Sequence, residues 1–198
     1  MPLLTPLMKF GIKKVVVTTL QAVSGAGRTL KDWPEMGENV IPFIGGEEEK
    51  SQLEPMKIWG TLDNGEIRLA TEPEISATCI RVPISDGHMA SVSVSFEKKP
   101  TKEEIIEAWK TFDPLKGLDL PFSPYPFITV MAEDDRPQTR IDRNIGNGMV
   151  ISAGRLREDN VFDFKFIGLS HNTIRGAAGG AILTAELLKV KGYLNGKD

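Results

Sequence analysis

The stretch Ala77–Ser95 constrains the fold more than any other part of this sequence. Within it, Met89–Phe96 alternates small or apolar residues with serine, which is typical of a half-buried β-strand. The dipeptide Asp86-Gly87 is typical of a tight turn, so His88 is predicted to lie at the mouth of that strand. A strand that starts at such a turn favours a sheet in which hairpins join many of the strands.

Other strands are predicted where β-branched and apolar residues lie between turn residues. The 198 residues include 13 prolines and 19 glycines, which implies many turns in a chain of ordinary globular composition. The further predicted strands are Ile12–Leu20, Phe127–Met131, Met149–Leu156 and Val161–Leu169, the last two paired as a hairpin through Arg157–Asn160. We therefore expect an α+β fold, with helices covering one face of a mostly antiparallel or mixed sheet.

Three helices have recognisable signals. Thr101–Glu104 is a capping box, and the acidic run Glu47–Glu49 suits the first turn of another helix. A third, rich in glycine and alanine at its start, is expected to be capped by Ser170 or Asn172. In the helix that begins at Glu47–Glu49, we expect a kink at Pro55. We expect its buried side to consist of Leu53, Met56 and Ile58 or Trp59.

Composition excludes several classes of function. The net charge is −3 with both signs interspersed, which argues against nucleic-acid or anionic-membrane partners. No apolar run is long enough to cross a bilayer, and a single cysteine fits a reducing cytoplasm. His88 and His171 are far apart without carboxylates at ligand spacing, so no metal site is predicted. Cys79 could pair with His88 as a nucleophile, but a buried small hydrophobe is the interpretation that its apolar run favours.

Polar candidates for chemistry remain, each with a plain structural alternative. His88 could be a general acid/base beside the anion-binding Arg81, or a turn histidine near a surface arginine. Glu54 and Lys57 share one helical face, as a functional pair or a solvated ion pair. The charged connector 132–147 is expected to hold surface ion pairs. The other candidates are Gln21, the small-residue loop Ser24–Gly27 and Asn172.

Four blocks in this order resemble aspartate-β-semialdehyde dehydrogenases of the archaeal and fungal-like branch. They are VVVTTLQAVSGAG, EEEKSQLEPMKIWG, TCIRVPISDGH and SHNTIRGAAGGAILTAELL, and together they span almost the whole chain. The resemblance implies the C-terminal domain of a glyceraldehyde-3-phosphate-dehydrogenase-like fold. It also implies NADP-dependent reductive dephosphorylation of L-4-aspartyl phosphate to the semialdehyde, in amino-acid biosynthesis, through a cysteine thioester.

The same resemblance implies a role for each matching residue. His88 would be the general acid/base, and Arg81 would clamp the substrate α-carboxylate. Glu54 would accept the substrate ammonium, and Lys57 would meet the phosphate. The remaining roles fall to Gln21 beside the thioester, to Ser24 and Gly25 near the cofactor, and to Asn172 at its nicotinamide end.

Two features of the family have no match in these residues: the glycine fingerprint of its nucleotide-binding domain and the Asn-Cys nucleophile motif. We therefore expect residues 1–171 to be the catalytic and dimerisation domain, with the nucleophile just before Met1. Residues 172–198 are expected to form a helix that packs against the nucleotide-binding domain. Expected partners are a small-molecule substrate and further copies of the chain, as a homodimer or homotetramer. A malonyl-CoA or succinyl-CoA reductase of the same fold, or a non-catalytic dimerisation module, are the alternatives.

Overall fold

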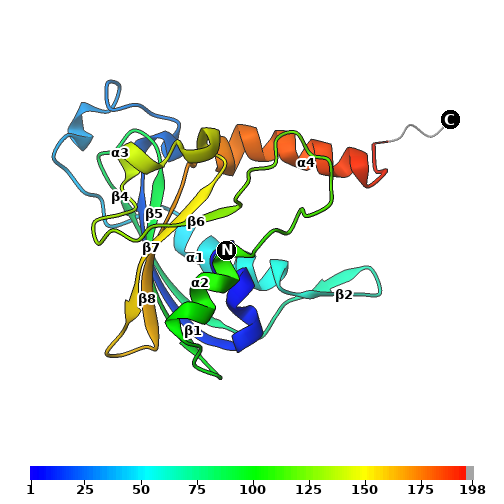
Figure 1. Cartoon of the computed structure of the whole chain (residues 1–198). Helices are drawn as coiled ribbons and strands as arrows, with labels where there is room; N and C mark the ends of the chain where they lie inside the picture. Colours follow the sequence, from blue (N-terminus) through cyan, green and yellow to red (C-terminus); the bar gives the residue numbers. More distant parts are fainter. Residues whose placement is uncertain (195–198) are drawn as a thin grey trace.

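A six-stranded sheet organises the computed structural model, which describes residues 1–194 (Figure 1). The sheet has the strand order β4-β1-β5-β8-β7-β6, and β2 and β3 form a separate hairpin. The strands are β1 (Ile12–Gln21), β2 (Thr61–Asp63), β3 (Glu66–Arg68), β4 (Glu74–Arg81), β5 (His88–Phe96), β6 (Ile128–Val130), β7 (Ile151–Glu158) and β8 (Phe164–Ser170). The α-helices are α1 (Glu47–Ile58), α2 (Lys102–Lys110), α3 (Thr139–Asp142) and α4 (Gly179–Val190).

The sheet is mixed, as expected. β1 runs parallel to β4 and β6 parallel to β7, while the β1–β5, β5–β8 and β8–β7 pairs are antiparallel. The predicted β7–β8 hairpin is confirmed, although β7 extends through Glu158 and the connection runs to Asp163. The predicted α+β fold with a mixed sheet is therefore confirmed.

Helices cover one face of this sheet and bury its core. The capping box predicted at Thr101 is present, with reciprocal bonds to Glu104, and it starts α2. Trp109 of α2 packs edge-on against Phe166 of β8 with ring centroids 5.0 Å apart. The indole N–H of Trp109 also donates to the Leu3 carbonyl at 2.8 Å. This bond and the burial of Leu3 fix the N-terminal segment against the covered face.

The opposite face of the sheet is open among the described residues. It is lined by alternate residues of β1, β4 and β5, which are small, polar or only half-buried: Val16, Thr18, Ser76, Thr78, Ser91 and Ser93. Val16 is 39% exposed at the centre of this face. The small side chains leave the surface flat, which suits packing against another sheet. No helix in the described part of the chain is long and apolar enough to span a membrane.

The expected buried side of α1 is confirmed for Met56 and Trp59, which are half-buried, with Trp59 packed against the core, but it is wrong for Leu53 and Ile58. Leu53 and Ile58 are 60% and 66% exposed, whereas Pro55 is buried inside a continuous helix. The reason is the partner of α1, which is the edge strand β4. Glu48 accepts the backbone N–H of Cys79 at 3.0 Å, so polar side chains of the helix face the exposed backbone of that edge.

The connector 132–147 also differs from the expectation of surface ion pairs alone. Asp142 is 1% exposed and accepts the Arg136 side chain through both carboxylate oxygens. It also accepts the Gln138 backbone N–H at 2.6 Å. The Arg136 guanidinium is the main reason that the pKa of Asp142 is lowered. This buried ion pair anchors the short helix α3.

The last helical segment begins with a π-helical turn, Ile174–Ala178, and continues as α4. The expected side-chain cap by Ser170 or Asn172 is wrong, because the cap residue is Thr173 and it makes no such bond. Leu183 is buried as expected for one side of the helix, but Ile182 is 46% exposed. The final four residues of the predicted 172–198 helix lie outside the described residues.

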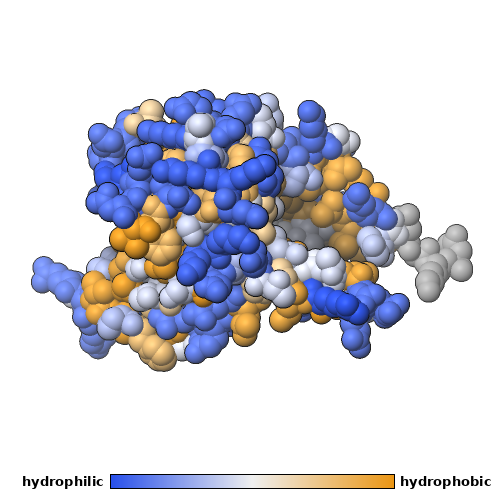
Figure 2. Space-filling view, turned by 90° about the horizontal axis from the view of Figure 1, so that it is seen from below, coloured by the Kyte–Doolittle hydropathy of each residue, from blue (hydrophilic) through white to orange (hydrophobic). Residues whose placement is uncertain are grey.

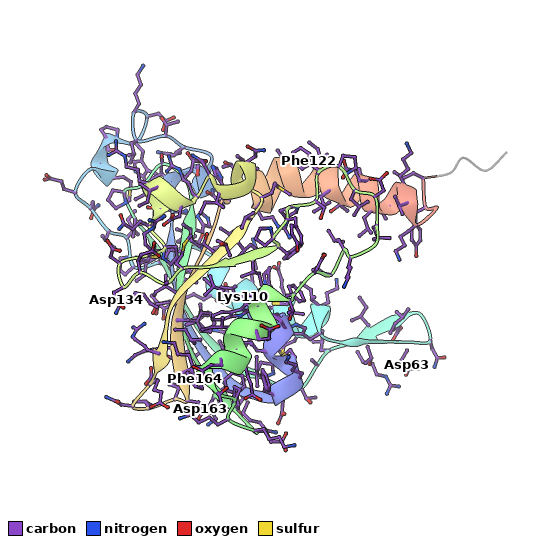
Figure 3. The ribbon with its side chains drawn as sticks, in the orientation of Figure 1. Asp63, Lys110, Phe122, Asp134, Asp163 and Phe164 are labelled. Atoms are coloured by element: carbon purple, nitrogen blue, oxygen red, sulfur yellow. The ribbon has the colours of Figure 1, made fainter. Side chains whose placement is uncertain are left out.

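Both α4 and the β2–β3 hairpin project beyond the body of the domain (Figure 1). Asp63 marks the projecting hairpin in Figure 3, and Figure 2 shows a hollow bordered by apolar side chains on the underside of the molecule. Apolar residues stay exposed on both projections, among them Leu62, Ile67, Ile182 and Val190. An exposed apolar surface of this kind is typical of a region that contacts further protein.

Candidate functional site

His88 stands where the sequence predicts it, as the first residue of β5 after a turn at Gly87. Gly87 has φ of +95°, a conformation that favours glycine and lets the chain turn directly into the strand. The imidazole Nδ1 accepts the Ala22 backbone N–H at 3.2 Å. Burial, reinforced by the nearby Arg81 charge, lowers the pKa of His88 to about 4. The ring is therefore neutral near pH 7, with its proton on Nε2.

Arg81 reaches the same place from the neighbouring edge of the sheet. It ends β4 and pairs in register with Gln21, the last residue of the parallel strand β1. Its Nη1 donates to the Ala22 carbonyl at 2.6 Å. Its backbone N–H and carbonyl are both hydrogen-bonded to the backbone of Ile41. Burial lowers the pKa of the guanidinium, and the charge of Glu47 partly offsets that shift. Arg81 and His88 thus lie close together as predicted, because both are bonded to the backbone of Ala22.

Glu47 and Lys50 complete this group, and the sequence reasoning missed them. Glu47 starts α1 and accepts the Gln21 side-chain amide at 3.3 Å and the Lys50 ammonium at 3.3 Å. Its charge also acts on both Arg81 and His88. The available signal was the EEEK run, which has the same i,i+3 acid–base spacing as the pair chosen from the sequence.

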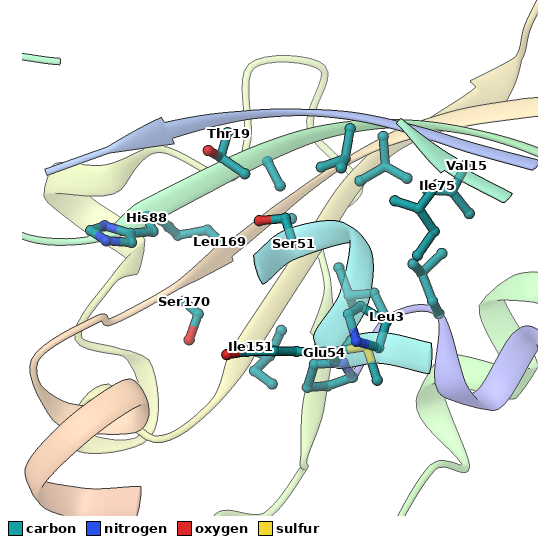
Figure 4. Close-up of a pocket in the computed structure, with 18 of the residues that line it drawn as sticks. Leu3, Val15, Thr19, Ser51, Glu54, Ile75, His88, Ile151, Leu169 and Ser170 are labelled. Atoms are coloured by element: carbon teal, nitrogen blue, oxygen red, sulfur yellow. The ribbon is translucent and has the colours of Figure 1, made fainter. Parts of the chain in front are cut away.

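The structure does not bring Glu54 and Lys57 to the same point. Both lie on exposed parts of α1. Glu54 lines the cavity near Leu3 and away from His88 (Figure 4), whereas Lys57 is not among the lining residues. Among the described residues, no hydrogen bond or ion pair joins the two.

Ser24, Gly25 and Asn172 meet beside His88 although Asn172 is far away in the sequence. The Asn172 amide donates to Ser24 Oγ at 2.9 Å, and its oxygen accepts the Gly87 N–H at 2.8 Å. A Cβ at Gly25 would lie 3.0 Å from both Arg81 Nη1 and His88 Nε2. Only a residue without a side chain fits there without displacing these groups.

A cavity of about 660 Å³ extends from His88 along the covered face of the sheet (Figure 4). His88, Thr19 and Ser170 lie at one end, and Val15, Ile75 and Leu3 at the other. The end with His88 is therefore polar, while the rest is largely apolar apart from Glu54. The size and lining of the cavity suit a small polar molecule at the His88 end and an apolar segment at the opposite end.

Cys79 is fully buried in β4, as the interpretation of a small hydrophobe predicted. Its Sγ lies 3.8 Å from Ser51 Oγ, and its backbone N–H is bonded to Glu48. No contact joins this thiol to His88 among the described residues. Inaccessible thiols of this kind are chemically inert.

Comparisons with known proteins show which class of domain this fold represents. The family described as "Semialdehyde dehydrogenase, dimerisation domain" matches residues 4–175, and the chain belongs to that family. An aspartate-semialdehyde dehydrogenase from Archaeoglobus fulgidus is 48% identical over 185 residues, which are 93% of this chain and 53% of that protein. The chain thus spans about half the length of the curated relatives it matches.

Solved structures show the same relationship. The crystal structure of aspartate semialdehyde dehydrogenase with NADP from Candida albicans has a TM-score of 0.85 at 39% identity, covering 97% of this chain and 55% of that one. Aspartate semialdehyde dehydrogenase II from Vibrio cholerae, complexed with ASA, has a TM-score of 0.73 at 26% identity, covering 97% and 59% respectively. The expected C-terminal domain of the glyceraldehyde-3-phosphate-dehydrogenase-like fold is confirmed.

Proposed function

We propose that this chain supplies the acid/base and substrate-binding half of an aspartate-semialdehyde dehydrogenase. The reaction is the NADP-dependent reductive dephosphorylation of L-4-aspartyl phosphate to L-aspartate 4-semialdehyde through a cysteine thioester, a step in the biosynthesis of lysine, methionine and threonine. The observation that carries this proposal is that His88, Glu47 and Lys50 line one cavity, while the buried Arg81 is bonded to the backbone of Ala22 beside His88.

His88 is the proton carrier in this proposal. Because Nδ1 accepts the Ala22 N–H, the ring presents Nε2 to the side where Gly25 leaves space. A neutral imidazole with its N–H at Nε2 can donate a hydrogen bond to a developing oxyanion and stabilise its charge. The bond to Ala22 fixes the tautomer and the orientation of the ring while it does so.

The charges of the site match a zwitterionic, phosphorylated amino acid. Arg81 has donors beyond the Nη1 bonded to Ala22 and can bind the α-carboxylate. We assign the ammonium to Glu47 rather than Glu54, because Glu47 is the carboxylate that lies beside Gln21 and acts on His88. For the same reason we assign the phosphate to Lys50, the cation bonded to Glu47.

The loop at residues 24–27 fits the cofactor that the family implies. Gly25 and Gly27 are exposed and carry no side chains, and Gly25 borders His88, so a flat ring can approach the backbone closely. Ser24 and Asn172, bonded to each other, would hold the nicotinamide end. NADP supplies or accepts the hydride when bound. The domain that binds most of the cofactor in this proposal is outside the 198 residues.

The nucleophile in this proposal also lies outside the 198 residues. Cys79 is buried away from His88, so the purified chain alone is expected to show no turnover and to act as a dimerisation module. The exposed apolar residues of α4 and of the β2–β3 hairpin are the proposed contact surface for the nucleotide-binding domain. Gln21, next to Glu47, would lie beside the thioester.

The test compares matched pairs of variants in the enzyme that joins this chain to the half present in its relatives. Semialdehyde oxidation with phosphate and NADP is measured for Glu47→Gln against Glu54→Gln, and for Lys50→Met against Lys57→Met. Glu47→Gln and Lys50→Met are expected to lower kcat/KM by about 10²-fold, the loss expected for one charged contact. Equal effects within each pair would contradict the assignment. Turnover of a CoA thioester instead of aspartyl phosphate would support the acyl-CoA reductase alternative.

A further inference from the structure

The turn that delivers His88 is held from outside its own hairpin. Arg143 Nη1 donates to Ser85 Oγ at 3.0 Å and to the Asp86 carbonyl at 2.9 Å. The aliphatic part of the same side chain lies against Gly87, where a Cβ would meet the Arg143 Cβ at 3.4 Å. One arginine thus contacts all three residues that precede His88.

Arg143 itself is rigidly placed. It follows α3 directly, and its neighbour Asp142 is the buried carboxylate bonded to Arg136 and to the Gln138 N–H. The Arg143 N–H also donates to the Thr139 carbonyl. Because this anchor is buried, the position of the Arg143 side chain is set by the far end of the sheet rather than by the turn that it holds.

The opposite side of the turn is held as well. Asn172 accepts the Gly87 N–H at 2.8 Å, and the Thr173 hydroxyl donates to the Asp86 carboxylate at 3.4 Å. The turn therefore lies between α3 on one side and the start of the last helical segment on the other. Removing Arg143 removes two of these bonds, and the turn then depends on Asn172, on Thr173 and on the Ser24 N–H, which donates to the Ser85 carbonyl at 3.3 Å.

We propose that Arg143 is a positioning residue, which holds the turn Ser85–Gly87 so that the His88 ring stays seated between Ala22 and Arg81. Its importance for turnover rests on the function proposed for His88, but the coupling of Arg143 to the His88 ring does not. A side chain aligned to within about an ångström matters for proton transfer, because such misplacement can cost about 10²-fold in rate.

An electrostatic role of Arg143 and a positioning role would change the pKa of different histidines. The charged groups that act on His88 are Arg81, Glu47 and Asp86, and Arg143 is not one of them. Arg143 does lower the pKa of His171, its other histidine neighbour. A purely electrostatic Arg143 would therefore affect His171, whereas a positioning Arg143 affects His88.

The experiment follows both imidazoles by NMR as the pH is changed, in the 198-residue chain and in three variants. Since the chain has two histidines, His171→Gln assigns the signals. Arg143→Met removes the bonds and the charge, and Arg143→Lys keeps the charge on a side chain that ends one bond short of Nη1, the nitrogen that donates to both acceptors. Arg140→Met is the matched control, an exposed arginine of the same short helix.

We expect the pKa of His88 to rise from about 4 by roughly one unit or more in both Arg143 variants, as the ring gains solvent. In Arg140→Met it should not change. An unchanged His88 pKa in both variants overturns the proposal, as does a rise in the Met variant that lysine fully reverses. Should Arg143→Met not fold, the Lys variant decides. None of these readouts requires turnover, so failure of the proposed enzyme function would be seen separately.

Discussion

Arg81 and His88 are both bonded to the backbone of one residue, since Arg81 donates to the Ala22 carbonyl at 2.6 Å and His88 accepts the Ala22 N–H at 3.2 Å. Ala22 is the first residue after β1, which lies between the two strands that carry Arg81 and His88. The distance between the cation and the imidazole is therefore set by the sheet. Burial, reinforced by the nearby Arg81 charge, keeps the histidine uncharged near pH 7.

The stability of the domain should depend on the protonation of His88. Its pKa in the folded chain, about 4, lies below the ordinary 6.5, so the unfolded chain binds the proton first as the pH falls. The free energy of unfolding should decrease by about 2–3 kcal/mol from pH 6.5 to 4, and the stabilisation should be fully present above 6.5. Urea unfolding across this range measures it. In the His88→Asn variant, the free energy of unfolding should depend less on pH. Parallel curves of unfolding free energy against pH for parent and variant would count against the lowered pKa of His88.

His88→Asn should lower kcat in the full-length enzyme by about 10²–10⁴-fold, the usual contribution of general acid/base catalysis. The asparagine retains bulk and hydrogen bonding but cannot carry a proton at neutral pH. KM for the substrate should change far less than kcat, because the substrate charges are met by Arg81 and Glu47. Steady-state kinetics with near-normal kcat would remove His88 from the proton-transfer role.

Gly25→Ala should disturb the site without unfolding the domain. The added Cβ would meet Arg81 Nη1 and His88 Nε2 at 3.0 Å, and both groups are held by bonds to Ala22. We expect kcat to fall roughly tenfold, less than the ~100-fold of a full ångström of misplacement. Gly176→Ala is the control, because a Cβ there meets nothing within 4 Å. Equal kcat values for Gly25→Ala and Gly176→Ala would show that the loop 24–27 shifts to make room for the added Cβ.

Asp142→Asn should destabilise the domain by about 2 kcal/mol, because it leaves the Arg136 charge unpaired beside a buried amide. Asp134→Asn, on an exposed residue, is the control. The lowered pKa of Asp142 means that its stabilising effect is present above the ordinary 3.8 and is lost as the pH falls below it. Parent and variant should therefore converge in acid. A constant difference in urea midpoint at all pH values would refute the pair's role.

The open face of the sheet is the proposed surface for self-association, in keeping with a dimerisation-domain family. Val16→Glu places a charge at its centre and should shift sedimentation at micromolar concentration toward the monomer. Val161→Glu is matched in chemistry but lies on a loop at 83% exposure, and it should behave like the parent. A parent chain that sediments only as a monomer would argue against this surface.

Local patterns were sufficient where neighbours in sequence decide the structure. The serine alternation after Asp86-Gly87 defines β5 and places His88, and the capping box at Thr101 defines the start of α2. The four blocks of resemblance identify the family before any contact is known. These features depend on backbone preference and short-range hydrogen bonds, which the sequence encodes directly.

The tertiary structure alone decided which side chains meet. Glu47–Lys50 and Glu54–Lys57 have identical i,i+3 spacing, and only the docking of α1 on β4 shows that the first pair faces Gln21, Arg81 and His88. Asp142 looked like one of several surface charges until the fold buried it against Arg136. Spacing along a helix is local, whereas the side that a helix turns toward a sheet is set by the whole packing arrangement. The sequence by itself therefore determined the family and the elements with strong local patterns, such as β1, β5 and α2. The strand β4, the β2–β3 hairpin and the grouping of the site residues were decided by the packing.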